Sequence, residues 1–349
     1  MARGLEGMRS RRQFVCWLGA ATPALCLGGL LQACGAAPGA TVAPATVAPA
    51  AKPSWPKLVA SYGSPIGAFA PLWMAKAVGA FEKYGVEVDV QYVETSAAVP
   101  AMIANSIDVQ ETSAAPIITA DVNGKQDLVF IASALNHPIL GLYATADITT
   151  AEQLKGKIVA SDKPGTPVDF AARLCLSLLS LKPEEVDLRA IGSTVEVTTA
   201  MLSGQVAAGV VGPPQSFQIE QKGFHLLKSI SDQPYQNIGV VARRSRLAEL
   251  ASALRPFLAA FRDGILAWNT QPALAMRVQD EYGKIGDPEI LRKSYEFYTT
   301  TASFELSLQP TLVGIKAMLD FLANSSLPSA ADYTPEQFVD TRFLSELPT

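Results

Sequence analysis

The chain is poor in the residues on which most enzyme and metal sites depend. Its 349 residues include four cysteines and two histidines. Three of the cysteines lie within the first 34 residues, so Cys175 has no disulfide partner in the rest of the chain. The motifs G-x-S-x-G, H-E-x-x-H, G-x-x-x-x-G-K and G-x-G-x-x-G do not occur in the sequence. We therefore predict that the protein is not an enzyme, uses no cofactor and holds no metal ion.

Positive charge is also scarce. There are 28 lysines and arginines against 32 aspartates and glutamates, which gives a formal net charge of −4. Because nucleic acids are bound by basic surfaces, this balance excludes nucleic acid as a partner. Apolar residues make up 49% of the chain, which is enough to fill a large core with more than one lobe. We expect a monomer built around such a core.

The N-terminal region lacks charge over one long stretch, from Phe14 to Leu31. The pair Arg11-Arg12 precedes this stretch, which ends in the sequence Leu-Gln-Ala-Cys34. A basic start, an apolar run and a small-residue end indicate an export signal. We interpret residues 1–33 as a twin-arginine-type lipoprotein signal peptide, with Cys34 as the lipidated first residue after cleavage. The alternative is that the same stretch remains uncleaved as a membrane anchor.

Residues 34–56 are rich in alanine and proline. The sequence of Ala40–Pro44, Ala-Thr-Val-Ala-Pro, is repeated at once as Ala45–Pro49. Such a stretch cannot bury a core and favours the extended polyproline II conformation. We expect a tether that ends where a folded domain begins, near Lys57. The protein is then exported, and is either periplasmic or tethered to the outer face of the cytoplasmic membrane.

The rest of the chain alternates between strand-like and helix-like patterns up to about residue 242. Segments with apolar residues at helical spacing separate short apolar runs, and the first of these helices is expected at 71–84. The strands are expected at 57–62, 86–93, 108–111, 128–134, 139–144, 157–161, 186–190, 207–211, 224–230 and 236–242. Everything after Ser245 has helical spacing. This order predicts the α/β class, with two lobes followed by a helical C-terminal part.

Five short segments of this body carry motifs in a defined order. They are Ala75–Val88, Asn105–Val109, Thr150–Val159, Met201–Ala208 and Gly286–Leu291. In order and spacing they resemble the motifs of the nitrate/sulfonate/taurine-binding proteins of ABC importers, a group that includes the binders of the thiamine pyrimidine precursor. The chain departs from the family pattern at two points, where Asn105 replaces a glycine and Ala207 replaces an aspartate.

The resemblance implies the type II periplasmic-binding-protein fold. In this fold two α/β lobes are joined by two hinge strands, and the helical C-terminal part packs on the first lobe. Lobe 1 would comprise residues 57–143 and 239–349, and lobe 2 would comprise residues 144–238. The hinge strands would be 139–144 and 236–242.

The resemblance also implies a function in solute import. The protein would be the extracytoplasmic binding component of an ABC importer, and would close like a clamshell on a small organic or oxyanion nutrient such as a sulfonate, taurine or nitrate. Its partners would then be this small molecule and a complex of permease and ATPase. An alternative ligand is a pyrimidine, a flavin or another heterocyclic vitamin precursor. Alternatives of another class are a stand-alone sensory binding protein and an enzyme on the same fold.

The loops that follow the predicted strands form the candidate binding site. In open α/β sheets, ligands bind beyond the carboxyl ends of the strands, over helix N-termini. Six such loops are rich in serine, threonine and glycine. The candidate ligand-binding residues are Tyr62, Gly63, Ser64, Phe69, Thr112, Ser113, Ala114, Asn136, His137, Gly165, Thr166, Ser193, Thr194, Gly212, Pro213 and Gln215. Of these, Tyr62, Phe69 and His137 are the candidates for stacking on a heterocycle.

The charges near these loops restrict the ligand. Asp169 and Glu196 stand at the third position of two predicted helices in lobe 2, where a carboxylate satisfies the helix N-terminus and repels an anion. The predicted helices of lobe 1 carry no acid in their first turn, so the charged end of an anionic ligand should lie on lobe 1. No arginine occurs in the six loops, which favours a monoanion or a neutral polar molecule over a divalent anion.

Overall fold

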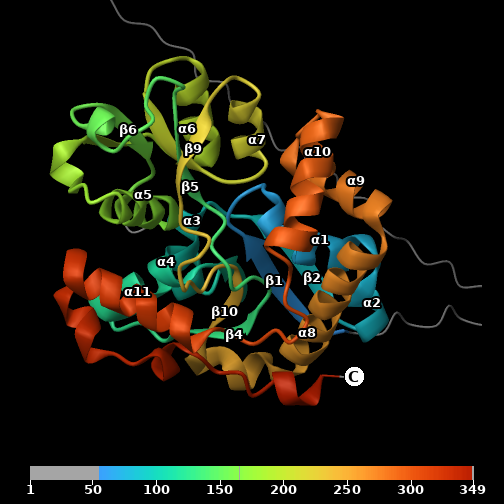
Figure 1. Cartoon of the computed structure of the whole chain (residues 1–349). Coiled ribbons are helices and arrows are strands. Elements are labelled where there is room, and N and C mark those ends of the chain that lie inside the picture. The colour runs from blue at the N-terminus through green and yellow to red at the C-terminus, as the bar shows by residue number, and fades with distance from the viewer. Residues whose placement is uncertain (1–54, 165, 348–349) are drawn as a thin grey trace, which may run out of the picture. The chain divides into compact units, whose positions relative to one another are not determined.

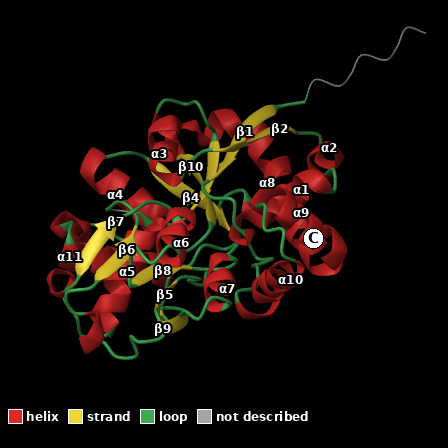
Figure 2. Cartoon of the chain, turned by 90° about the horizontal axis from the view of Figure 1, so that it is seen from above, coloured by secondary structure: helices red, strands yellow, loops and turns green. Residues whose placement is uncertain are grey.

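The computed structural model describes residues 55–164 and 166–347. The expected signal peptide, Cys34 and most of the Ala/Pro-rich tether lie outside these residues, as does the candidate Gly165. Within the described ranges, no helix is both long and apolar enough to cross a membrane. The ten strands of this part of the chain form two five-stranded sheets, which Figure 2 shows as two separate groups.

The first sheet has the strand order β2-β1-β3-β10-β4. Its strands are β1 (Lys57–Tyr62), β2 (Glu87–Tyr92), β3 (Val109–Thr112), β4 (Leu128–Ser133) and β10 (Gly239–Arg243). β1 pairs in parallel with β2 along its whole length, from Lys57 opposite Glu87 to Tyr62 opposite Tyr92. β1 also pairs in parallel with β3, whereas β10 is antiparallel to β3 and β4. The late strand β10 therefore lies between two early ones.

The second sheet repeats this arrangement with the order β7-β6-β8-β5-β9. Its strands are β5 (Gly141–Ala144), β6 (Ile158–Ser161), β7 (Asp187–Ala190), β8 (Ala208–Val211) and β9 (His225–Ser229). β6 is parallel to β7 and β8, whereas β5 is antiparallel to β8 and β9. We refer to each sheet with the helices between its strands as lobe 1 and lobe 2.

The chain passes between the sheets twice, along residues 134–140 and 230–238, which we call the crossing segments. They are hydrogen-bonded to each other, since the N–H groups of Ala134 and Leu135 donate to Ile238 O at 2.9 and 3.0 Å. The strands themselves begin at Gly141 and Gly239, later than the expected starts at 139 and 236. Because β5 pairs wholly within the second sheet, residues 141–143 belong to lobe 2, and the expected boundary at 143 lies three residues too late.

Helices cover both faces of the first sheet (Figure 1). One face packs against α1 (Ala70–Ala77), α2 (Ala80–Tyr84) and α8 (Leu247–Thr270), and the other against α3 (Thr95–Ile103) and α4 (Ala114–Gly124). The single helix expected at 71–84 is wrong, because Gly79 adopts a left-handed conformation with φ +69° and separates α1 from α2. At Gly264 of α8, a Cβ atom would lie 2.2 Å from Pro71 O, so this glycine allows the close approach of α8 to α1.

Lobe 2 has α5 (Pro167–Leu178) on one face of its sheet and α6 (Thr194–Leu202) and α7 (Gln215–Glu220) on the other. Cys175 is buried in α5 and is a free thiol. The core on the α5 face is continuous with the α3–α4 face of lobe 1, and α11 (Leu312–Ser325) contributes to it. The two lobes therefore share one hydrophobic core on this side.

The C-terminal helices α9 (Pro272–Gly283), α10 (Pro288–Glu296) and α11 pack on lobe 1, and they also reach lobe 2. Figure 1 shows α10 beside α7 and α11 close to α5. A π-helical turn, Phe297–Thr301, follows α10, and Tyr298 Oη within it donates to Pro213 O at 3.1 Å. On the other side, the ring of Phe321 meets the edge of Phe170 at a centroid distance of 4.6 Å. The C-terminal part thus bridges the lobes at two places.

Candidate functional site

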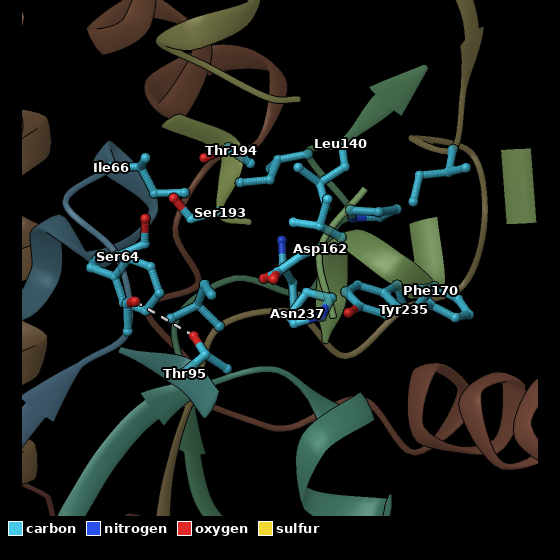
Figure 3. A pocket seen from close by; sticks show the side chains of 18 of the residues that line it. Ser64, Ile66, Thr95, Leu140, Asp162, Phe170, Ser193, Thr194, Tyr235 and Asn237 are labelled. Carbon is cyan, nitrogen blue, oxygen red and sulfur yellow. Dashed lines mark hydrogen bonds between the residues drawn. The ribbon is translucent and has the colours of Figure 1, made fainter. Parts of the chain in front are cut away.

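A cavity of about 80 Å³ lies between the lobes, beside the crossing segments (Figure 3). Both lobes and both crossing segments contribute to its wall. The residues from lobe 1 are Gly63, Ser64, Ile66, Phe69, Glu94 and Thr95; those from lobe 2 are Asp162, Pro167, Val168, Phe170, Ser193 and Thr194; and those from the crossing segments are Pro138, Ile139, Leu140, Ile230, Tyr235, Asn237 and Ile238. A change in the angle between the lobes would therefore change the cavity itself.

The size of the cavity limits what it can hold. A buried water needs about 10–15 Å³ of such volume, so the cavity has room for about five to eight waters or for a small solute in their place. Much of the wall is apolar. Phe170 and Tyr235 form part of it as a stacked pair, with their ring centroids 5.1 Å apart and their planes within 8° of parallel. These dimensions and this lining suit a small organic molecule.

Four neighbouring strands place their carboxyl ends at the cavity. Gly63 and Ser64 follow β1, Glu94 and Thr95 follow β2, Asp162 follows β6, and Ser193 and Thr194 follow β7. Because β1 and β2 are neighbours, as are β6 and β7, each sheet offers one pair of strand ends to the same space. The site therefore has the strand-end position that open α/β sheets share.

Five of the candidates from the sequence line this cavity. They are Gly63, Ser64, Phe69, Ser193 and Thr194. Tyr62 lies behind Phe69, with a ring-centroid distance of 6.4 Å, and its ring packs against Trp73. It supports the wall and is not part of it.

The candidates after β3 and β8 are not brought to the cavity. They are Thr112, Ser113, Ala114, Gly212, Pro213 and Gln215. The crossing segments occupy these strand ends: Gln236 O accepts a hydrogen bond from Ala114 N at 3.1 Å, and a Cβ on Gly212 would lie 2.6 Å from Ile139 O. The antiparallel strands β10 and β5 pair with β3 and β8, and the chain leading into them covers the ends that a purely parallel sheet would leave open.

The remaining described candidates have local roles. Thr166 caps α5, since its hydroxyl accepts from Asp169 N. Asn136 donates from Nδ2 to Gln309 O at 2.9 Å and so ties the first crossing segment to the C-terminal part. The side chain of His137 is exposed, and its carbonyl accepts from Asn237 Nδ2 at 2.7 Å. None of these three residues lines the cavity.

Sequence reasoning missed several lining residues. Glu94 and Asp162 each stand one residue beyond a predicted strand, so the strand-end rule contained the signal that could have found them. Phe170 and Tyr235 line the cavity although only 6% and 4% of their surfaces are exposed, and apolar spacing gives no sign of this role. No rule pointed to the crossing segments, because their place beside the cavity follows from how the two sheets are joined.

Three helices, α3, α5 and α6, present their N-termini to the cavity. Each carries its own carboxylate there. Asp169 and Glu196 occupy the first turns of α5 and α6, as expected, and Glu94 is the N-cap residue of α3 and lines the cavity. α1, α3 and α4 of lobe 1 carry no acid in their first turn, as expected, but Glu94, just before α3, opposes an anion as a carboxylate in the first turn does.

Two of these acids are held by neighbours within lobe 2. Asp169 Oδ1 accepts from Arg173 Nε at 2.9 Å, and Glu196 accepts from the Ser193 hydroxyl. Glu94 Oε1 accepts from the Ser96 hydroxyl at 3.0 Å, and Lys163 Nζ of lobe 2 lies 3.9 Å from the same oxygen. The pKa of Tyr92 is raised, first by partial burial and then by the charges of Glu94 and Glu196, so this ring lies near acids of both lobes.

The cavity has no basic side chain in its described wall. Asp162 is its other acid, and Asp162 Oδ1 accepts from Lys163 N at 2.6 Å. Burial raises the pKa of the Asp162 carboxyl, and the nearby charge of Glu94 raises it further. Among the residues that the structure describes, no three or more His, Cys, Asp or Glu side chains are grouped so that they could hold a metal ion.

Comparison with solved structures shows which fold the chain has. The alkanesulfonate-binding protein SsuA from Xanthomonas axonopodis pv. citri, bound to MOPS, is 17% identical with a TM-score of 0.68, and the match covers 83% of this chain and 99% of that one. The periplasmic nitrate-binding protein NrtA from Synechocystis PCC 6803 is 13% identical with a TM-score of 0.65, and the match covers 84% of this chain and 88% of that one. The chain has the periplasmic-binding-protein fold, as expected. At these identities the likeness establishes the fold alone.

The family is shown by the sequence. Residues 67–275, more than half of the chain, match the family model described as NMT1/THI5 like, and the chain belongs to this family. This agrees with the resemblance to the nitrate/sulfonate/taurine-binding proteins. Comparison with curated proteins gives no match. The fold also occurs in an enzyme, the desulfurization enzyme DSZB. It is 12% identical with a TM-score of 0.56, and the match covers 82% of this chain and 98% of that one.

Proposed function

We propose that the protein is the extracytoplasmic solute-binding component of an ABC importer and that it binds a small organic solute in the cavity between its lobes. The observation that carries this proposal is the origin of the cavity wall, which comes from both lobes and from both crossing segments. A solute in this position contacts every part that moves when the lobes close, so binding and closure are coupled. The closed form is then what a permease and its ATPase recognise.

The cavity wall favours one of the ligand classes considered. A nitrate or a simple sulfonate would find helix N-termini here, but also Glu94 and Asp162, and no lysine or arginine among the described lining residues. A heterocyclic or other mainly apolar solute would find the stacked rings of Phe170 and Tyr235 and the ring of Phe69. We therefore place the heterocyclic alternative ahead of the oxyanion. We propose solute binding and not catalysis because the sequence contains neither the G-x-S-x-G nucleophile motif nor the H-E-x-x-H metal-binding motif.

The proposed location follows from the N-terminal sequence. Arg11-Arg12 and the apolar stretch direct export. Either the signal is cleaved and Cys34 carries a lipid, or the apolar stretch stays uncleaved and anchors the chain in the membrane. The Ala/Pro-rich residues 34–56 then act as a tether that keeps the receptor near its permease. Lipid attachment is tested by mass spectrometry of the N-terminal peptide from membranes; an intact chain beginning at Met1 would favour the anchor.

A ligand screen followed by scattering tests the proposed function. We expect that a thermal-shift screen over sulfonates, nitrate, pyrimidines, flavins and small amines finds a stabilising solute, since a ligand at 100 times its Kd stabilises by about 2.7 kcal/mol. Small-angle X-ray scattering should then show a smaller radius of gyration with this solute. A tightly bound solute that leaves the scattering curve unchanged would overturn the clamshell mechanism.

A cavity-filling substitution tests whether the solute binds in this cavity or elsewhere on the protein. Val168 lines the cavity and is 7% exposed, so Val168→Phe should block the solute. Val195 lies on α6 outside the cavity and is 42% exposed, so Val195→Phe is the matched control. We expect Val168→Phe to abolish binding and Val195→Phe to leave it unchanged; equal binding by both variants would place the site elsewhere.

A further inference from the structure

The cavity presents carboxylates from opposite lobes. Glu94 precedes α3 in lobe 1, and Asp162 follows β6 in lobe 2. The two charges are near enough that Glu94 contributes to the raised pKa of Asp162, after burial itself. The cation near them, Lys163 Nζ, is 3.9 Å from Glu94 and has a side chain that is 62% exposed. Glu94 also accepts from the Ser96 hydroxyl, and Asp162 accepts from Lys163 N, so two hydrogen-bonded carboxylates of opposite lobes face one cavity that has no basic residue in its described wall.

Uncharged groups in the wall add further acceptors. Asn237 is 5% exposed and lines the cavity; its Nδ2 donates to His137 O, and its Oδ1 has no hydrogen-bond partner among the described residues. Thr194 is 6% exposed, and its hydroxyl likewise has no partner in the described part of the chain. Figure 3 shows Asn237 and Asp162 side by side on one wall of the cavity. The Asn237 amide oxygen and the Thr194 hydroxyl oxygen are both accessible and can accept a hydrogen bond from a ligand.

The described wall offers carboxylate, amide and hydroxyl oxygens, and it contains no lysine or arginine. We propose that the cavity selects a small solute with a positively charged nitrogen, such as an ammonium, a guanidinium or a protonated ring nitrogen, held by Glu94, Asp162 and the Asn237 amide oxygen. The apolar part of the solute lies against Phe170 and Tyr235. This inference rests on the proposed function and names the class of solute that the same site takes.

The charge arrangement also makes closure depend on the solute. Without a solute, Glu94 and Asp162 repel each other across the lobes, while Lys163 of lobe 2 attracts Glu94. A cation between the two carboxylates replaces their repulsion with two attractions, so the closed form gains free energy when the cation is present. An anion of the same shape would add a third negative charge and would keep the lobes apart.

The test uses three probes that share a phenyl ring bearing one carbon substituent and differ in charge: benzylammonium, benzyl alcohol and benzoate. Each is titrated into the full protein by calorimetry, and its effect on the unfolding temperature is measured. We expect benzylammonium to bind at least tenfold more tightly than the other two. Glu94→Gln and Asp162→Asn should each weaken its binding about ten- to a hundredfold, because each removes one charged hydrogen bond.

Asp232→Asn is the control variant. Asp232 is exposed and outside the cavity wall, and its substitution makes the same change in net charge. It should leave benzylammonium binding unchanged. The unfolding temperatures of the three variants without a probe show whether each one folds.

The outcomes separate this inference from the proposed function. Tighter binding of benzoate, equal binding of the three probes, or undiminished binding by Glu94→Gln and Asp162→Asn would overturn the inference that the solute is a cation. Solute-dependent compaction would still support the proposed function as the binding component of an importer. If only another solute of the screen binds, its charge decides: a cation supports the inference and a neutral molecule or an anion overturns it. Binding by no probe and no solute would overturn the proposed function.

Discussion

The hydrogen bond between Tyr298 and Pro213 tests whether the C-terminal part controls lobe closure. Tyr298 is fully buried in the turn after α10, and its Oη donates to Pro213 O of lobe 2 at 3.1 Å. Tyr298→Phe removes this donor and keeps the ring. If the lobes separate on opening, the bond is lost then, and the substitution makes opening easier.

The expected size of the effect follows from the value of one hydrogen bond. A neutral bond contributes about 0.5–1.5 kcal/mol net, which changes the equilibrium between closed and open forms by about two- to twelvefold. If the closed form is the minor one without solute, the apparent Kd rises by the same factor. Calorimetry with a bound solute should show the weaker affinity, and scattering at a subsaturating solute concentration, where open and closed forms are both populated, should show a larger radius of gyration in Tyr298→Phe.

Tyr295 supplies the control. Its hydroxyl donates to Trp268 O at 3.4 Å within the C-terminal part, so Tyr295→Phe removes a similar bond that does not join the lobes. We expect this variant to unfold at a somewhat lower temperature, with an unchanged scattering curve and an unchanged affinity for the solute. If both variants change the scattering and the affinity alike, or if neither does, the Tyr298 bond does not restrain the lobes and our reasoning is refuted.

Three further predictions concern stability and reactivity. Gly264→Ala should lower the free energy of unfolding by about 1–3 kcal/mol in denaturant titrations, because the new Cβ would overlap Pro71 O; an unchanged midpoint would show that α8 can move away from α1. Burial raises the pKa of Asp121 to about 7, so its charge destabilises the fold increasingly from about pH 4 to pH 7 and fully above; Asp121→Asn should therefore stabilise by a few kcal/mol at pH 8 and by little at pH 4, and an equal gain at both would refute this assignment. Burial raises the pKa of Cys175 to about 12, so peptide mapping should find this thiol unlabelled by alkylating reagents in the native protein and labelled after unfolding; native labelling would contradict its burial.

Hydrophobic periodicity was sufficient to predict the order of strands and helices. The strand expected at 57–62 coincides with β1, and α6 lies between the strands expected at 186–190 and 207–211. These segments carry their signal locally, in the spacing of apolar residues and in capping residues such as Ser193. The break at Gly79 was missed because apolar spacing continues across it, although the glycine supplies the left-handed conformation that divides the helix.

The candidate site was predictable only where strand ends remain open. The rule that ligands lie beyond strand ends brought Gly63, Ser64, Ser193 and Thr194 to the cavity. The same rule failed after β3 and β8, because the crossing segments cover those ends. The rule was applied only to loops rich in serine, threonine and glycine, so it did not select Glu94 and Asp162.

The sequence alone determined the class of fold and the family, because both depend on signals that neighbouring residues carry, namely apolar spacing and short motifs. Only the tertiary structure decided which strand ends meet, that the crossing segments form part of the cavity wall, and that the C-terminal helices bridge both lobes. It also decided the charge of the cavity. Glu94 and Asp162 are 68 positions apart in the sequence. They face one space because each follows a strand of a different sheet, and long-range strand pairing, which no local pattern encodes, sets where those strands end.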